Sequence, residues 1–246
     1  MRLFLLDQSF QGQKTYTING KDSHYIVDVL RLPIGQTITA RDYKAGLWSL
    51  KLISIGKGSC TVQTSPLAQP CETTDSLPEY QDLKPLILYQ CITRPKKLEQ
   101  IVRQASEIGV RKIILVESRF CCREKIRMER LEAQRKEAIQ QSGSIIPTEI
   151  AGPVKLSDIE DNSEGKALFF HQTSLPEQRR LGEVLADLES PTSILIGPEG
   201  GLDEYECSAL IHKHFEPVLL DTNILRAETA AVYALSVVQT AIQNRN

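Results

Sequence analysis

The chain lacks several features that would assign it to a functional class at once. None of its apolar runs approaches the roughly 20 residues that a membrane-spanning helix requires. Its six cysteines form no Cys-x-x-Cys pair and share no zinc-ligand spacing with the four histidines. No Gly-x-Gly-x-x-Gly follows a first strand, as a Rossmann dinucleotide site requires. We therefore expect no membrane span, no metal and no Rossmann dehydrogenase.

The amino-terminal end also lacks the pattern of a signal peptide. Its short apolar stretch reaches Asp7 too early for a secretory signal. Together with the scattered cysteines, this predicts a cytoplasmic protein whose thiols stay reduced. Hydrophobic residues make up 41% and charged residues 24% of the 246 positions, which is typical of a globular protein with one or two domains.

Charge is distributed unevenly along the chain. Residues 1–150 contain 22 Lys and Arg against 16 Asp and Glu, whereas residues 151–246 contain 7 against 15. The formal net charge of −2 conceals this difference. A polyanion would bind the basic part, but solvated helix faces produce the same excess. Charge by itself therefore does not indicate nucleic acid.

Short apolar segments separated by turns dominate the first 70 residues. They predict strands at 2–6, 15–18, 36–42, 47–55 and 59–64. One helix, at 22–32, interrupts them, with Tyr25, Ile26, Val29 and Leu30 on one face. A mostly β segment of this length with many turns predicts a small barrel.

The pattern changes after a polar, proline-rich stretch at 66–85, which we interpret as a linker. Beyond it, the sequence predicts strands at 86–92, 113–116 and 167–170, helices at 95–109, 128–142 and 177–188, and an irregular stretch at 144–165. Strands that alternate with helices predict a parallel sheet covered by helices. A final helix carries an alanine-rich side from Ala227 to Ile242, which suits a close contact within the chain or in a dimer.

Two strand-to-helix turns near the carboxyl terminus have the composition of ligand loops. The first joins the apolar run 194–196 to Gly-Pro-Glu-Gly-Gly at 197–201, where glycines let a small molecule approach the backbone. A capping box of Asp203 and Glu206 predicts a helix from about Leu202.

The second turn joins the apolar run 218–220 to Ile-Leu-Arg-Ala-Glu-Thr-Ala at 224–230. We expect the two turns to be adjacent and to form one pocket. Ordinary crossovers whose glycines only cap the elements are the alternative interpretation.

The order of these two motifs resembles the SPOUT superfamily of S-adenosylmethionine-dependent RNA methyltransferases. Within it, the chain is similar to the small-subunit (16S) ribosomal RNA uracil-N3 methyltransferase family. The segment His-Tyr-Ile-Val-Asp-Val-Leu-Arg at 24–31 also resembles that family's signature, a His followed by Val-Leu-Arg. The motifs are jointly specific, and the resemblance extends more thinly over the whole chain.

The resemblance implies an α/β fold in two parts. Residues 1–72 would form a PUA-like RNA-binding β-barrel, and residues 73–246 a SPOUT methyltransferase domain whose carboxyl-terminal segment forms a trefoil knot. It further implies a homodimer that acts on ribosomal RNA in the small subunit.

The same resemblance implies which residues carry the function. The implied S-adenosylmethionine contacts are His171, Gln172, Gly197, Glu199, Gly200 and Gly201, with Leu219, Leu220, Ile224 and Leu225 as an apolar wall. The implied RNA contacts are Arg2, His24, Arg31, Arg94 and Arg119. Arg226 and Glu228 are the implied catalytic residues.

The chemistry explains why an arginine would stand at 226. Uracil N3 is a weakly acidic imide nitrogen, and loss of its proton places negative charge on O2 and O4. A fixed cation beside these oxygens lowers the barrier, and a guanidinium is always charged. Glu228 would orient Arg226 or accept the proton, and we favour orientation. Structural alternatives are an Arg226–Glu228 ion pair and a helix-capping role for Glu199.

The chain departs from the family pattern at three basic positions, which hold Gln104, Ser144 and Asn223. Nearby cations could compensate, because phosphate contacts are interchangeable; these are Arg94, Lys96, Lys97, Arg103, Arg119 and Arg123. Two alternative functions stay open. One is a SPOUT methyltransferase for another RNA position, such as a ribose 2′-hydroxyl. The other is a non-catalytic RNA-binding or assembly protein that retains the pocket.

Overall fold

The computed structural model describes residues 4–7, 9–42, 46–67, 85–144, 147–161, 165–188 and 192–244. The chain divides into two compact units, one made of residues 1–80 and 139–147, the other of residues 81–138 and 148–246. Arg2 and most of the linker predicted at 66–85 lie outside the described residues. Within the described ranges, no helix is long and apolar enough to cross a membrane.

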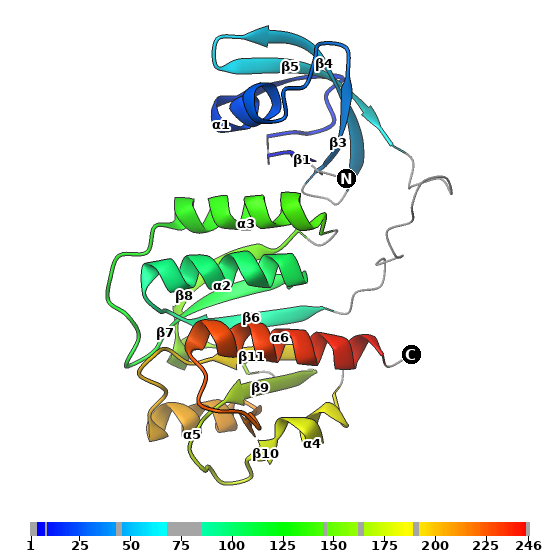
Figure 1. Cartoon of the computed structure of the whole chain (residues 1–246). Helices are drawn as coiled ribbons and strands as arrows, with labels where there is room; N and C mark the ends of the chain where they lie inside the picture. The colour runs from blue at the N-terminus through cyan, green and yellow to red at the C-terminus, as the bar shows by residue number, and fades with distance from the viewer. Residues whose placement is uncertain are drawn as a thin grey trace. The chain divides into compact units, whose positions relative to one another are not determined.

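The first unit contains a five-stranded sheet in the order β1-β3-β4-β5-β2 (Figure 1). Its strands are β1 (Phe4–Leu5), β2 (Thr15–Asn19), β3 (Thr37–Arg41), β4 (Leu47–Gly56) and β5 (Ser59–Pro66). Pairing is antiparallel except between β1 and β3. The core includes Leu50, Leu52 and Val62, all fully buried. The predicted strands are therefore confirmed where they are described.

The predicted helix at 22–32 is wrong in its length and its geometry. The structure has an α-helix, α1 (Gly20–His24), followed directly by a π-helix, η1 (Tyr25–Val29). The Leu30 N–H donates to Tyr25 O, five residues back, at 2.8 Å. The wider turn of a π-helix rotates later side chains away from the α-helical face. Ile26 is consequently buried while the Val29 side chain, predicted on the same face, is 53% exposed.

The second unit is a seven-stranded sheet in the order β10-β12-β9-β11-β6-β7-β8, and every pairing is parallel. Its strands are β6 (Leu86–Cys91), β7 (Lys112–Glu117), β8 (Glu149–Lys155), β9 (Lys166–Phe170), β10 (Arg179–Arg180), β11 (Thr192–Ile196) and β12 (Phe215–Leu219). Its helices are α2 (Pro95–Ile108), α4 (Leu181–Leu185), α5 (Glu204–His212) and α6 (Ala227–Gln243), with the 3-10 turn η3 (Leu156–Asp158). Helix α3 (Met128–Ser142) begins in this unit, and its residues from 139 onward belong to the first. The predicted parallel sheet is confirmed.

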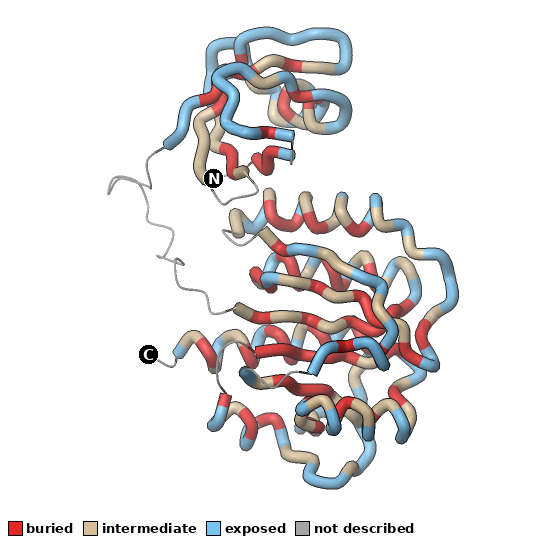
Figure 2. The backbone as a smooth tube through the Cα atoms, turned by 180° about the vertical axis from the view of Figure 1, so that it is seen from behind, coloured by how far each residue is buried: buried red, intermediate tan, exposed pale blue. Residues whose placement is uncertain are grey.

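Both faces of this sheet are buried, as its apolar strands require. Alternate residues of a strand point to opposite faces. Leu168 and Ile194 pack with residues of α2 and α6, whereas Phe169 and Leu195 pack with residues of α5. Figure 2 shows the buried residues running along the central strands.

The long helices of this unit follow the sequence signals closely. Pro95 begins α2, and Gly109 ends it in the left-handed region, with φ 91°. The alanine-rich side of α6 is buried in one apolar cluster with residues of α2 and β11, and Ala231 and Ala234 are fully buried there. Gln239 Nε2 donates to Ile108 O at 2.8 Å between the same helices. The described structure therefore covers the alanine-rich side from within the chain.

The stretch 149–155, predicted as irregular, is the strand β8. Its Gly152-Pro153 pair obscures the strand pattern, but proline is tolerated because β8 lies at the end of the sheet. Gly152 adopts φ 93°, and a Cβ there would lie 2.6 Å from Leu115 O of β7. The pairing of β7 with β8 shifts register at this point, between Ile114 and Val116 of β7.

The helix predicted at 177–188 is also wrong, because the structure divides this segment into β10 and the short α4. Arg179 forms ion pairs with Glu216 of β12 (3.3 Å) and with Asp187 beyond α4 (2.7 Å). These tertiary contacts favour strand pairing where the local pattern favoured a helix.

Candidate functional site

Three parallel strands place the predicted functional segments at one edge of the second sheet. The two turns at 197–201 and 220–226 were predicted to be adjacent, but β9 lies between β11 and β12. Because all three strands are parallel, their carboxyl ends meet at the same edge. His171 follows β9 directly and thus stands between the two turns. The prediction of adjacent turns was wrong, and the intervening strand supplies a predicted site residue.

The glycine loop, defined here as residues 197–201, contains three glycines in different environments. Gly201 has φ 74°, which favours glycine. At Gly200 a Cβ would lie 2.8 Å from Phe120 Cβ, closer than packing allows. At Gly197 a Cβ would make only an ordinary 3.5 Å contact with Leu202. The fold therefore explains Gly200 and Gly201, but not Gly197.

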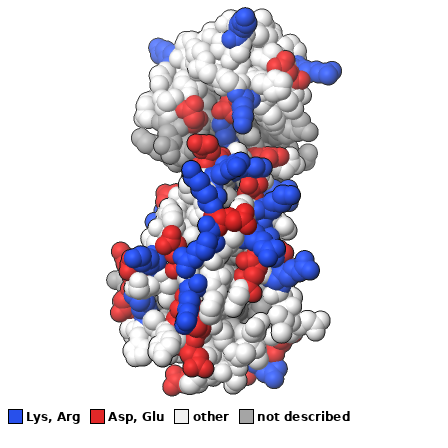
Figure 3. Space-filling model, turned by 90° about the vertical axis from the view of Figure 1, so that its left-hand side faces the viewer, with Lys and Arg blue, Asp and Glu red and all other residues white. Residues whose placement is uncertain are grey.

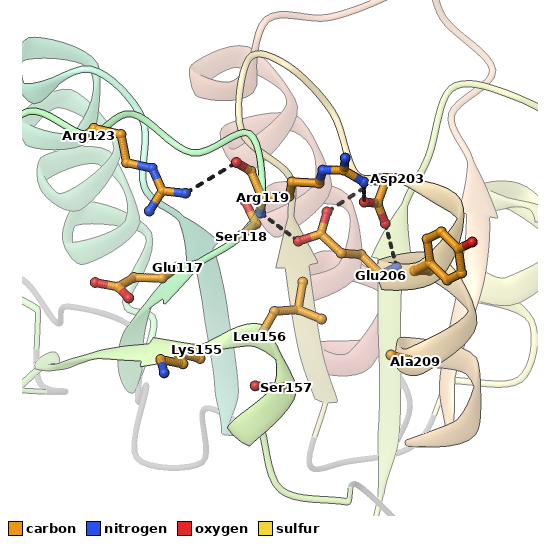
Figure 4. A pocket seen from close by; sticks show the side chains of 11 residues that line it. Glu117, Ser118, Arg119, Arg123, Lys155, Leu156, Ser157, Asp203, Glu206 and Ala209 are labelled. Atoms are coloured by element: carbon orange, nitrogen blue, oxygen red, sulfur yellow. Dashed lines mark hydrogen bonds and ion pairs between the residues drawn. The ribbon is translucent and has the colours of Figure 1, made fainter.

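The helix that follows the loop begins as the sequence predicted. Asp203 Oδ1 accepts a hydrogen bond from the Glu206 N–H at 2.7 Å, and Glu206 Oε2 accepts from the Asp203 N–H at 3.1 Å. Arg119 joins this capping box: its Nη1 lies 2.9 Å from Asp203 Oδ2, and its backbone N–H donates to Glu206 Oε1 at 2.7 Å (Figure 4). The Glu206 N–H and then Arg119 lower the pKa of Asp203.

A shallow cavity of about 420 Å³ lies beside this capping box. It is lined by Glu117, Ser118, Arg119, Arg123, Lys155, Leu156, Ser157, Asp203, Tyr205, Glu206 and Ala209 (Figure 4). Arg119 is the one predicted site residue among them. The cavity carries charges of both signs and is distinct from the edge formed by β9, β11 and β12.

Lys97, in the first turn of α2, connects the two motifs. Its Nζ lies 3.6 Å from Glu199 Oε1 in the glycine loop and 3.2 Å from Glu228 Oε2 in the first turn of α6. Glu199 Oε1 also accepts a long hydrogen bond, 3.4 Å, from the Arg94 N–H at the start of α2. We call this arrangement the Lys97 bridge. Glu199 thus contacts the start of a helix, as we expected from the alternative in which it has a helix-capping role.

The bridge changes the expected partnership between Arg226 and Glu228. Glu228 forms its ion pair with Lys97, while no ion pair involving Arg226 occurs among the described residues. Arg226 is the N-cap residue of α6 and is exposed. Burial raises the pKa of Glu228, but hydrogen bonding, Lys97 and the charge of Arg226 outweigh it and lower the pKa overall. Glu228 is therefore a carboxylate at neutral pH, bound to Lys97 rather than oriented against Arg226.

His171 is fixed through both its backbone and its ring. Its N–H donates to Val218 O at 3.1 Å, and its carbonyl accepts from Gln178 Nε2 at 2.8 Å. The ring contacts Thr173 Oγ1 at 2.6 Å and Cys207 Sγ at 3.8 Å. Burial lowers the pKa of His171 and, with nearby carboxylates, raises that of Cys207 to about 11, so both side chains are neutral at pH 7. The neighbouring Gln172 is exposed.

The predicted apolar wall is present only in part. Leu219, Leu220 and Leu225 are half-buried. The Ile224 side chain is 79% exposed and does not line the interior of this chain.

Two predicted RNA contacts of the first unit, His24 and Arg31, lie in an unusual backbone segment. His24 Nδ1 lies 2.6 Å from Asp28 Oδ2 across the junction of α1 and the π-helix. Arg31, just beyond it, is exposed and adopts φ 50°, a left-handed conformation that is uncommon for residues other than glycine. Strained backbone and π-helical turns both cluster at functional sites.

In the view of Figure 3, Lys and Arg side chains gather over the second unit, with Asp and Glu among them. Of the cations that could compensate for the missing basic residues, Lys97, Arg103 and Arg119 already form ion pairs within the chain. Arg94 and Lys96 are exposed. Sequence reasoning missed the bridge because Lys97 lies 102 residues before Glu199 and 131 before Glu228, and no local spacing connects them.

Two family models match the chain. One, described as an RNA methyltransferase domain, matches residues 80–239, and the other, an RNA methyltransferase PUA domain, matches residues 18–65. A "Ribosomal RNA small subunit methyltransferase E" of Aquifex aeolicus is 34% identical over 175 residues, covering 68% of this chain and 73% of the relative. The protein of that name from Rickettsia conorii is 26% identical and covers 97% of this chain and 94% of its own length.

Solved structures share the fold along the whole chain. A small-subunit ribosomal RNA methyltransferase E of Neisseria gonorrhoeae, bound to S-adenosyl methionine, has a TM-score of 0.80 at 24% identity over 98% of both chains. A methyltransferase of Legionella pneumophila in complex with the same cofactor has a TM-score of 0.80 at 21% identity over 97% of both chains. At these identities, the likeness shows a common α/β fold.

Proposed function

Since the chain belongs to the SPOUT family of small-subunit ribosomal RNA methyltransferases, we propose that it methylates N3 of a uridine in 16S ribosomal RNA with S-adenosylmethionine as donor. One observation carries the proposal. Three parallel strands bring the glycine loop, His171 and the Arg226 turn to one edge of the sheet. Such an edge, outside the carboxyl ends of parallel strands, is where open α/β sheets bind ligands.

The glycine loop fits the cofactor. Gly197 is the glycine whose missing side chain the fold does not require, so a ligand is the simplest reason for it. Gly200 and Gly201 shape the loop, His171 and Gln172 stand between the turns, and Leu219, Leu220 and Leu225 supply apolar surface. Glu199 would act on the cofactor mainly by holding the loop, because its carboxylate already contacts α2. When bound, S-adenosylmethionine supplies an electrophilic methyl group.

Arg226 fits the role of the cation that stabilises the uracil. Its guanidinium is exposed and has no ion pair among the described residues, so it is available to an incoming base. Directed N–H donors beside O2 and O4 stabilise the charge that develops as N3 loses its proton. The reacting base must be unpaired, because N3 lies on the Watson–Crick edge. Glu228, kept ionised by its own backbone N–H and by Lys97, would fix the first turn of α6, which follows Arg226.

We assign RNA contact to exposed basic residues of both units. His24 and Arg31 belong to the first unit and Arg94 to the second, and we add Arg2 from its sequence position. Arg119 would contribute only as an already paired cation. We further propose the PUA-like barrel at 1–72, the trefoil knot within 73–246 and a homodimer, all on the family resemblance.

The decisive experiment measures labelled methyl transfer from S-adenosylmethionine to small ribosomal subunits that lack native modification. The product nucleoside is identified by mass spectrometry. N3-methyluridine at one site is the expected result. A ribose-methylated nucleoside would assign the enzyme to another RNA position. Cofactor binding without transfer would indicate a non-catalytic RNA-binding or assembly protein.

A further inference from the structure

The Lys97 bridge joins segments that are far apart in the sequence but meet at the proposed site. Lys97 belongs to α2, Glu199 to the glycine loop and Glu228 to α6. The three side chains are 26%, 31% and 13% exposed. One ammonium group thus lies between two carboxylates, each from a different motif.

We propose that Lys97 is a positioning residue. It holds the glycine loop and the turn at 220–226, which carries Arg226, in fixed positions relative to each other through Glu199 and Glu228. This inference rests on the proposed function, because it concerns the geometry of the same site. It gives Lys97 a role different from that of a phosphate contact, which its place among the basic residues of the sequence would otherwise favour.

The charges of the cluster support this role. Apart from Lys97, Glu228 Oε2 has no polar partner among the described residues. A mostly buried carboxylate without a counter-charge is costly, and two such carboxylates repel each other. Lys97 removes both penalties at once. Its ammonium is a compact point charge with three donors, which suits two partners that lie in different directions.

The element that carries Lys97 is itself well anchored. Helix α2 packs along α6, and Gln239 of α6 donates a hydrogen bond to Ile108 at the far end of α2. At the near end, the Arg94 N–H contacts Glu199. Because both ends of α2 are fixed to the elements that form the site, Lys97 transmits a defined position to the two turns.

Loss of the bridge has an electrostatic signature. The groups that lower the pKa of Glu228 are its own backbone N–H, Lys97 from α2 and Arg226 from the preceding turn. Glu199 lies beyond Lys97. Without Lys97, only the hydrogen bond from the Glu228 N–H and the charge of Arg226 oppose the effect of burial, and the pKa of Glu228 rises. Protonation of Glu228 would then begin at higher pH. The loss of kcat on the acid side of the pH profile should therefore also begin at higher pH.

Lys96 provides a matched control. It stands beside Lys97 on α2, carries the same charge, is exposed, and has no ion pair among the described residues. Replacing either lysine by methionine removes one charge and keeps most of the aliphatic stem. Only the Lys97 change breaks the bridge.

The experiment compares Lys97→Met, Lys97→Arg and Lys96→Met in the full chain. For Lys97→Met we expect a loss of kcat on the order of 100-fold, the effect of misplacing a reacting group by about 1 Å, with the acid side of the pH profile shifted to higher pH. Lys97→Arg should recover part of the lost kcat and reverse part of the shift in the pH profile. Lys96→Met should weaken RNA binding. The slope of log affinity against log salt concentration should become shallower by about 0.7–0.9, the change expected for one lost phosphate contact.

The inference is overturned if Lys97→Met changes the salt slope of RNA binding as Lys96→Met does and leaves kcat and the pH profile unaltered. Calorimetry with S-adenosylmethionine separates this outcome from failure of the proposed function. If the wild-type chain binds the cofactor but methylates no uridine, the proposed function fails. The bridge is then tested by cofactor affinity, which should fall in Lys97→Met and be restored by Lys97→Arg.

Discussion

At the scale of single residues, the three glycines of the 197–201 loop differ in what they do. Gly197→Ala should leave the free energy of unfolding nearly unchanged, because its Cβ meets Leu202 at an ordinary distance. It should weaken cofactor binding by roughly 10- to 100-fold, the effect of about 1–3 kcal/mol of steric strain. Gly200→Ala should instead destabilise the fold by about 1–3 kcal/mol, since Phe120 must move.

Calorimetry with S-adenosylmethionine and denaturant unfolding test this contrast. Gly182→Ala is the control, because nothing lies within 4 Å of its added Cβ. If Gly197→Ala and Gly182→Ala bind the cofactor equally well, the glycine loop is not where the cofactor approaches.

Arg226 gives a second residue-scale prediction. Arg226→Ala should lower kcat by about 100- to 1,000-fold, as the loss of a charge-stabilising donor does, and change cofactor affinity far less. Single-turnover kinetics and calorimetry measure the two effects. Equal losses in both would make Arg226 part of the pocket structure rather than a catalytic residue.

The family resemblance named candidate residues for the site, but local reasoning could not find their partners. Arg226 and Glu228 are two positions apart, and local reasoning paired them with each other. In the structure, Glu228 contacts Lys97, about 130 residues earlier in the chain. Charge pairs of this kind depend on which helices pack together, and no single-sequence spacing records that.

At the scale of elements, the ends of helices were well predicted because caps are local. Pro95 and Gly109 bound α2, and Asp203 with Glu206 begins α5. The failures lie where tertiary contacts override a local pattern. Segment 149–155 pairs as an edge strand despite Gly152 and Pro153. Segment 177–188 forms a short strand and a short helix because Arg179 forms ion pairs with Glu216 and Asp187.

The α5 cap makes a prediction at this scale. Asp203→Ala should cost about 1 kcal/mol at pH 7, the usual effect of removing an N-cap carboxylate. The folded-state pKa of Asp203 is lowered, so its contribution is fully present above the ordinary carboxyl range near 4. It is lost as the pH falls through the folded pKa.

Denaturant unfolding at pH 7 and at about pH 3 checks this dependence, which rests on the lowered pKa. The difference between wild type and Asp203→Ala should be smaller at the lower pH. Ser208→Ala, an exposed position on the same helix, is the control. A difference that does not depend on pH would show that the carboxylate charge is not what stabilises α5.

At the scale of the whole molecule, the two units should contribute separately to binding. Arg31 belongs to the first unit, and the glycine loop to the second. Arg31→Ala and Arg31→Gly both remove the charge, so both should weaken RNA binding and leave cofactor affinity unchanged. Glycine tolerates φ 50°, so Arg31→Gly should also be more stable than Arg31→Ala by about 1 kcal/mol.

Filter binding across salt concentrations and thermal unfolding measure these effects. Equal RNA affinity for wild type and both variants would remove Arg31 from the RNA contacts. Equal stability of the two variants would mean that the left-handed backbone at 31 carries no strain.

The position of β9 between β11 and β12 has a consequence for how this molecule can change. Both β11 and β12 pair with β9 residue by residue, so the position of β9 determines where the turns that follow β11 and β12 begin. Inserting one residue into β9 would advance His171 by about 3.3 Å past both turns at once. It would also exchange the two faces of the strand. The turns can therefore accept substitutions one at a time, whereas the length of β9 can change only if the whole site is rebuilt.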